Sequence, residues 1–179
     1  MIRGSSFSIR PIQEKDLPRI LGFLNDVECK GNYYPIQLTT DVALRKSYEE
    51  NAFWQPHNGH FYIVNEKDEV IGDLQYYRTT HYFEWLELGW ILFDEAYRQK
   101  GIMSEALGLF VKFLFDTKNI NRVQAAIFSE NVASIRLARK LGFKLEGTAR
   151  EAMFHQGKHQ DIDIYSLIRR EFNPLGREQ

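Results

Sequence analysis

The spacing of apolar residues changes along this chain, and the order of the changes restricts the fold more than any single motif does. Apolar residues at helical spacing predict a helix over about 14–26, and a second helix is expected at about 40–51. Three strand-like segments follow, over 60–64, 70–77 and 83–93. Their short connections predict an antiparallel meander in the middle of the chain.

Helices and strands alternate in the rest of the sequence. The remaining predicted elements are a strand at 7–10, a helix at 101–117, a strand at 122–128, a helix at 131–141 and two strands at 143–154 and 160–170. This order predicts an α/β fold with a mixed central sheet of about seven strands, flanked by about four helices. A chain of 179 residues has the usual size of one domain, so we expect a single domain over residues 1–179 with its core at about 7–171.

Composition and charge exclude several classes of function. The formal net charge is -1, so no overall field favours binding to nucleic acid or to an acidic membrane. The one cysteine, Cys29, excludes an internal disulfide and a zinc framework, and we expect no metal. No apolar run approaches the ~20 residues of a membrane span, and residues 1–6 lack the apolar segment of a signal peptide. A cytoplasmic protein is therefore expected.

One junction between a strand and a helix has the features of an anion site. Residues 98–103 read Arg-Gln-Lys-Gly-Ile-Met and lie where the predicted meander ends and a helix begins. The first N–H groups of a helix have no partner within it, and the helix dipole adds partial positive charge there. Gly101 allows the backbone to approach a bound group closely. The alternative is a basic loop with a packing glycine and no ligand.

The order of these motifs resembles the GNAT N-acetyltransferase superfamily, and in detail its RimJ/RimL-like branch. The resemblance rests on the 98–103 turn, on the Asn-x-x-Ser segment at 131–134 and on Leu-Gly-Phe at 141–143, and it extends over nearly the whole chain. It implies acetyl-CoA as co-substrate, with its pyrophosphate held by Arg98, Gln99, Lys100, Gly101, Ile102 and Met103. Met103 departs from the small residue that the family has at this position.

Acyl transfer from a thioester to an amine requires a neutral amine, donors for the oxyanion and help for the leaving thiol. The resemblance implies that the backbone N–H groups of Ile91, Leu92 and Phe93 contact the cofactor side. It also implies that Ser134 assists the thiol, which needs only modest help to leave. Asn131 is either an N-cap of the following helix or a cofactor contact, and both roles can hold together.

The general base is less clearly marked in the sequence. Met153 occupies the position of the base in RimL-like enzymes and cannot titrate. Glu87, a carboxylate within an otherwise apolar strand, is the best replacement, since burial can raise its pKa toward the working range. It can instead be a structural carboxylate. His155, His159 or a base fed by solvent are the other candidates.

These observations predict an acyl-CoA-dependent N-acyltransferase that favours acetyl. It would act by direct attack in a ternary complex on a primary amine, either a protein N-terminus or a small molecule. The alternative is a non-catalytic acyl-CoA-binding sensor, which Met153 and Ala138 keep open because the family often has a tyrosine at the position of Ala138. A homodimer is suggested by resemblance alone.

Overall fold

The computed structural model describes residues 1–173, and within that range it contains nine strands and four α-helices. By backbone contacts the described residues form two compact units: the first comprises residues 1–76 and 89–106, and the second residues 77–88 and 107–173. Residues 174–179, which the predicted single domain includes, lie outside the described residues. The single domain therefore stays a prediction.

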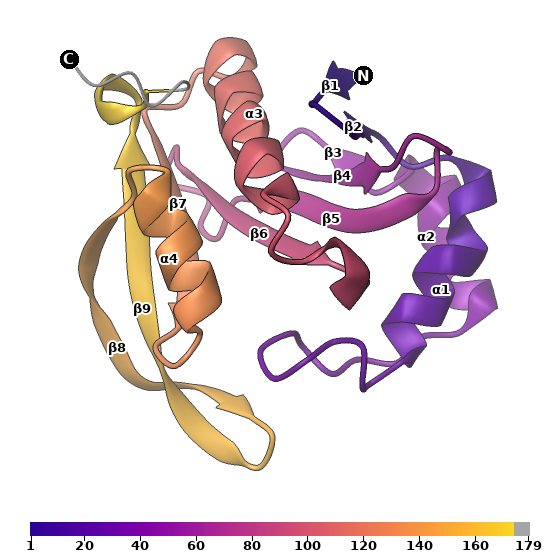
Figure 1. Cartoon of the computed structure of the whole chain (residues 1–179). Coiled ribbons are helices and arrows are strands. Elements are labelled where there is room, and N and C mark those ends of the chain that lie inside the picture. The colour runs from indigo at the N-terminus through magenta and orange to yellow at the C-terminus, as the bar shows by residue number, and fades with distance from the viewer. Residues whose placement is uncertain (174–179) are drawn as a thin grey trace. The chain divides into compact units, whose positions relative to one another are not determined.

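The first unit combines most of the N-terminal strands with two short helices. Its elements are β1 (Ile2–Arg3), β2 (Ser8–Arg10), α1 (Leu17–Asn25), α2 (Asp41–Asn51), β3 (Trp54–Gln55), β4 (Asn58–Val64), most of β5 (Val70–Tyr77), the end of β6 (Leu86–Leu92) and the first turn of α3 (Ile102–Thr117). The strands follow the order β1-β2-β4-β5-β6, and β3 pairs with β4. Helices α1 and α2 run side by side (Figure 1).

One apolar cluster holds α1 and α2 to the strands of the first unit. Helix α1 contributes Leu17, Ile20 and Phe23, and α2 contributes Leu44, all of them at most 6% exposed. The ring of Phe23 stacks on that of Phe93, with 4.0 Å between the ring centroids. Burying a side chain of this size contributes about 1.5–3 kcal/mol, so these few contacts account for the helical spacing seen in the sequence.

A buried ion pair connects β2 to the start of α1. The guanidinium of Arg10 donates to Asp16, with 2.7 Å between Nη1 and Oδ2, and also to Asp68, with 2.8 Å between Nε and Oδ1. Arg10 and Asp16 are 3% and 4% exposed. Asp16 also accepts a hydrogen bond from the backbone N–H of Gln13. The charge of Arg10 is therefore balanced by structural partners.

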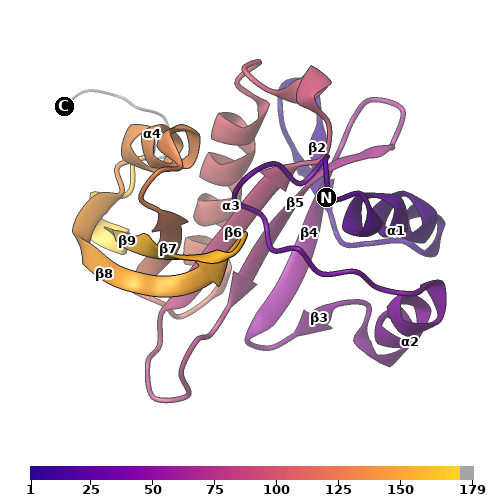
Figure 2. The ribbon, with the colours of Figure 1, turned by 90° about the horizontal axis from the view of Figure 1, so that it is seen from below.

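The second unit contains the C-terminal strands and two helices. Its elements are the end of β5, the start of β6, most of α3, β7 (Arg122–Phe128), α4 (Val132–Lys140), β8 (Lys144–His155) and β9 (Lys158–Ile168). Strands β6 and β7 are parallel, whereas β9 is antiparallel to both β7 and β8. Strands β8 and β9 form a long curved hairpin, and α4 lies over one face of this sheet (Figure 2).

The α/β class and the mixed sheet are confirmed. All seven predicted strands and four predicted helices are present, and the structure adds β1 and β3. Each added strand has only two residues, too few to show an alternating pattern. Gly142, just after the end of α4, has a positive φ of 88°, and both Gln156 and Gly157 have a positive φ in the turn between β8 and β9.

Candidate functional site

The 98–103 turn adopts a backbone that suits a bound anion. Gln99 and Gly101 have φ of 59° and 78°, and α3 begins immediately afterward at Ile102. The hydrogen bond that closes the first helical turn runs from the N–H of Glu105 to the C=O of Gly101, at 3.1 Å. The N–H groups of residues 102–104 therefore have no acceptor within the helix. A Cβ added at Gly101 would meet nothing within 4 Å, so the space beside this backbone is open.

The side chain of Arg98 is less available than the backbone of this turn. The Nη1 atom of Arg98 is 2.7 Å from Oε1 of Glu95, and this exposed pair neutralises the guanidinium. The backbone N–H groups and the helix dipole are therefore the groups in the turn that fit a pyrophosphate best.

Of the three backbone donors predicted at 91–93, one has an acceptor in a neighbouring strand. The N–H of Phe93 donates to the C=O of Ile71 at 2.9 Å, so this donor is already engaged within the first unit. Ile91 packs against the apolar cluster of α1 and α2, and Leu92 is 9% exposed. The cofactor role of all three residues stays a prediction.

In the second unit, Asn131 and Ser134 lie together at the start of α4. The Asn131 side chain caps the helix, with its Oδ1 accepting from the N–H of Ser134 at 3.1 Å. The Ser134 side chain is half-buried, and its hydroxyl makes no hydrogen bond within residues 1–173. The N-cap role of Asn131 is thus confirmed, and Ser134 presents a hydroxyl that a ligand can use.

Glu87 lies on β6 in the second unit and is only 8% exposed. The hydroxyl of Tyr77 donates to its Oε1 at 2.9 Å, and Nε2 of Gln124 donates to its Oε2 at 3.1 Å. Burial raises the pKa of Tyr77, and the negative charge of Glu87 raises it further. Tyr77 therefore stays protonated and remains a donor. The partners of Glu87 are therefore neutral donors, rather than the arginine or backbone group that a purely structural carboxylate would be expected to have.

The predicted site residues thus fall into two sets. Residues 91–93 and the 98–103 turn belong to the first unit, and Glu87, Asn131 and Ser134 belong to the second. Within the second, the structure brings Asn131 next to Ser134 and gives Glu87 its partners Tyr77 and Gln124.

The first unit also contains an acid–histidine pair that was not predicted from the sequence. On adjacent strands, Nδ1 of His60 is 3.3 and 3.2 Å from the two carboxylate oxygens of Asp73. The side chains are 27% and 5% exposed. The ring centroids of Phe53 and Tyr62 are 6.0 and 6.4 Å from the centroid of the His60 ring. The two residues are 13 positions apart, and only the pairing of their strands brings them together.

This pair makes the stability of the protein depend on pH. Burial disfavours the charged imidazole, but the charge and hydrogen bond of Asp73 outweigh it and raise the pKa of His60. The protonated form therefore stabilises the folded state. This contribution is complete below the ordinary histidine pKa of about 6.5 and is lost as pH rises through the higher pKa of the folded protein. We expect His60→Gln to lower the free energy of unfolding most in acid and less as pH rises.

Urea unfolding at a series of pH values checks this prediction. The exposed His57, which pairs with no carboxylate in the described part of the chain, supplies the control variant His57→Gln. A cost of His60→Gln that stayed constant with pH would contradict the proposed ion pair.

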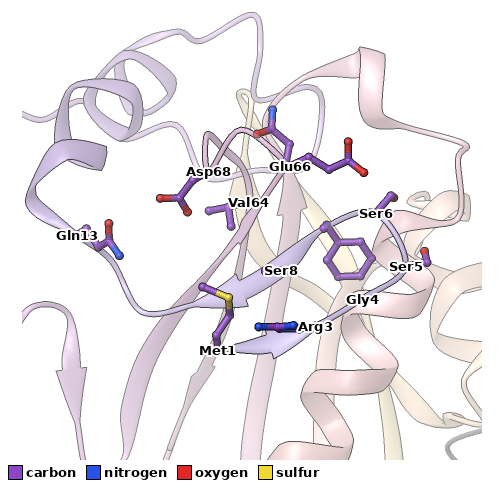
Figure 3. A pocket seen from close by; sticks show the side chains of 12 residues that line it. Met1, Arg3, Gly4, Ser5, Ser6, Ser8, Gln13, Val64, Glu66 and Asp68 are labelled. Carbon is purple, nitrogen blue, oxygen red and sulfur yellow. The ribbon is translucent and has the colours of Figure 1, made fainter.

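A separate cavity lies near the N-terminus of the chain. It has a volume of about 390 Å³ and is lined by residues of β1 and β2 and of the turn after β4, among them Arg3, Glu66 and Asp68 (Figure 3). The carboxylate of Asp68 already binds Arg10 and Lys15. No predicted site residue lines this cavity, so its geometry adds nothing to the acyl-transfer site.

Residues 1–173 contain neither a candidate metal site nor a helix that could span a membrane. Within this range, no three His, Cys, Asp or Glu side chains are placed to hold a metal ion. None of its helices has the length and apolar character needed to cross a membrane.

Comparison with known proteins settles the family. The model described as acetyltransferase (GNAT) domain matches residues 7–144, which is more than half of the chain. The chain belongs to the GNAT acetyltransferase family. This GNAT protein is an acyl-CoA-dependent N-acetyltransferase with acetyl-CoA as its co-substrate, as its resemblance to the family implied.

Individual relatives agree with this assignment. YoaA of Bacillus subtilis (strain 168), an uncharacterized N-acetyltransferase, is 27% identical over 166 residues, which cover 90% of this chain and 92% of YoaA. Among solved structures, the ribosomal-protein acetyltransferase RimL in complex with coenzyme A superposes with a TM-score of 0.81 at 22% identity, covering 92% of this chain and 95% of RimL. Spermidine N-acetyltransferase from Vibrio cholerae, in complex with CoA and spermine, has a TM-score of 0.82 at 17% identity, covering 94% and 98%. These structures share the GNAT fold with this chain.

Proposed function

We propose that this GNAT enzyme acetylates a primary amine by direct attack of the amine on the thioester in a ternary complex. The observation that carries the proposal is the environment of Glu87, a buried carboxylate that two neutral donors hold and that pairs with no cation among residues 1–173. A carboxylate placed in this way can accept the proton of an incoming ammonium. The amine nitrogen then bonds to the acetyl carbon as the carbon–sulfur bond breaks.

The other proposed roles belong to the turn and to α4. The N–H groups at the start of α3 would hold the pyrophosphate, with Gly101 allowing the close approach. The hydroxyl of Ser134 would donate a hydrogen bond to the leaving sulfur. Asn131 would keep Ser134 in place through the N-cap, and a cofactor contact by Asn131 is compatible with this role. The backbone of 91–93 would contribute the donors that sheet pairing leaves free.

The proposed acceptor is a primary amine, and the relatives act on more than one kind. RimL acts on a ribosomal protein, whereas the Vibrio cholerae enzyme acts on spermidine. Both acceptors present a primary amine, which is the chemistry that Glu87 would serve. We also expect a cytoplasmic location and a homodimer. The rival, a non-catalytic acyl-CoA-binding sensor, would bind acetyl-CoA without turnover.

A panel of amines tests the enzyme against the sensor. The protein is mixed with acetyl-CoA and with peptides bearing free N-termini, polyamines, amino sugars or aminoglycosides, and the release of free thiol is followed. We expect turnover with at least one amine. Saturable binding of acetyl-CoA without thiol release from any amine would favour the sensor.

The role of Ser134 is tested with the best acceptor from this panel. Because a thiol of pKa about 8.5 leaves readily, we expect Ser134→Ala to lower kcat by only about tenfold, with little change in KM for the amine. Ser47→Ala, which removes an exposed hydroxyl from α2, serves as the matched control. A kcat equal to that of the control would remove Ser134 from the mechanism.

A further inference from the structure

A row of polar side chains crosses the sheet of the second unit and ends on Glu87. Glu87 pairs with Gln124 between β6 and β7, and Gln124 pairs with Ser166 between β7 and β9. Residues paired in this way project from the same face of a sheet. The row continues to Glu146 on β8, whose carboxylate accepts hydrogen bonds from the hydroxyl of Ser166 and from Arg122. A contiguous polar chain thus connects the outer strand of this sheet to the proposed base.

The orientation of the Gln124 amide is determined by its two neighbours. Its Nε2 donates to Oε2 of Glu87 at 3.1 Å, and its Oε1 faces Nη2 of Arg122 at 3.5 Å. A rotation of the amide by 180° would place its oxygen against the carboxylate and its N–H group against the guanidinium. Both contacts would be repulsive, so one orientation is strongly favoured.

Arg122 is itself fixed on two sides. Its Nη1 is 2.9 Å from Oε1 of Glu146, and its guanidinium carbon is 5.5 Å from the ring centroid of Trp85. The hydrogen bond from Ser166, followed by that from Arg122, lowers the pKa of Glu146, so this anchor stays ionised. The position of the cation therefore does not depend on Glu87.

We propose that Gln124 is a positioning residue for Glu87, with Arg122 selecting the amide orientation that presents an N–H group to the base. This inference rests on the proposed role of Glu87. The Gln124 amide and the Tyr77 hydroxyl each bind one carboxylate oxygen, which fixes the plane of the group. The remaining lone pairs are then directed in a constant orientation at the ammonium of the acceptor.

The variant Gln124→Leu removes the donor from a half-buried position and keeps a side chain of similar size. One hydrogen bond to a charged group is lost, so kcat/KM for the amine should fall on the order of tenfold. The acid limb of the pH profile of kcat/KM should move to higher pH, because the ionised form loses a donor. KM for acetyl-CoA should stay unchanged. The carboxyl carbon of Glu87, followed by ¹³C NMR, should titrate at a higher pH in the variant even without substrate.

Two further variants complete the test. Gln160→Leu is the matched control, because it removes a glutamine that donates to the backbone C=O of His155 in the same unit, and it should leave the acid limb unchanged. Arg122→Met releases the amide orientation and should move the acid limb in the same direction as Gln124→Leu, by a smaller amount. If Gln124→Leu does not fold, the acid limb of kcat/KM and the titration of the Glu87 carboxyl carbon, both measured on Arg122→Met, test the proposal instead.

The possible failures are distinguishable. If Glu87→Gln keeps wild-type turnover, the proposed base is wrong, and the positioning role falls with it. If Glu87→Gln is inactive but Gln124→Leu and Arg122→Met leave both the acid limb and the Glu87 titration unchanged, only the positioning inference is overturned.

Discussion

Replacing Gly101 by valine should weaken CoA binding by at least about a hundredfold, because the loss of two hydrogen bonds to a charged group costs about 3 kcal/mol or more. Gly101 has φ of 78°, a conformation that a β-branched residue adopts only with strain. Its Cβ would also occupy the open space beside the first N–H groups of α3. Both effects remove donors from the phosphate. Isothermal titration calorimetry with CoA gives the Kd directly.

The hairpin turn between β8 and β9 supplies the control for this variant. Gly157 has nearly the same backbone conformation, with φ of 81°, and a Cβ added there would also meet nothing within 4 Å. Gly157→Val therefore imposes similar backbone strain outside the 98–103 turn, and it should leave the Kd for CoA close to that of the wild type. A folded Gly101→Val protein that binds CoA as tightly as Gly157→Val would exclude the turn as the pyrophosphate site.

Glu87→Gln should lower kcat by about a hundredfold or more, the usual contribution of a general base. The substitution keeps the shape of the side chain but removes the group that takes the proton from the ammonium. Both neighbours can keep a hydrogen bond, because the new amide oxygen can accept from Gln124 and the new amide N–H can donate to the hydroxyl of Tyr77. Single-turnover kinetics with saturating acetyl-CoA separates the chemical step from substrate binding.

The pH dependence of the residual activity provides a second measure of Glu87. If the amine must lose its proton to water in the variant, its rate should rise with pH up to the pKa of the amine, without the plateau of the wild type. Glu84→Gln changes an exposed carboxylate three residues earlier and should leave the profile unaltered. If the kcat of Glu87→Gln is within about threefold of that of Glu84→Gln, the loss of rate is far smaller than the loss expected for a general base, and this role is excluded.

Local patterns were sufficient to predict most of the fold. The spacing of Leu17 and Ile20 on α1 reflects the face that packs on the first unit's strands, and Gly142 ends α4 because the backbone there needs a positive φ. The two short strands could not be predicted in the same way. Each exists only because a neighbouring strand pairs with it, and two residues contain no period.

The proposed site could be predicted only in part, because its side chains meet through strand pairing. Glu87 stands out in the sequence as a charge within an apolar strand, but its partner Gln124 comes 37 positions later and depends on a register that no local pattern reveals. The pair of His60 and Asp73 could not be predicted either, because it too depends on the pairing of two strands. The ion pair between Arg98 and Glu95 could have been predicted from the sequence, since an opposite charge three residues away is a common partner.

The polar row from Glu87 to Glu146 also has a consequence for how the length of this chain can vary. Side chains alternate between the faces of a strand, so a single deletion or insertion next to Gln124 within β7 would turn its amide to the opposite face and separate it from both Glu87 and Arg122. Substitutions in the row alter one link, whereas a change of length breaks several at once. Insertions and deletions are therefore expected to accumulate in the 78–84 connection and in the 156–157 turn, and to spare β7.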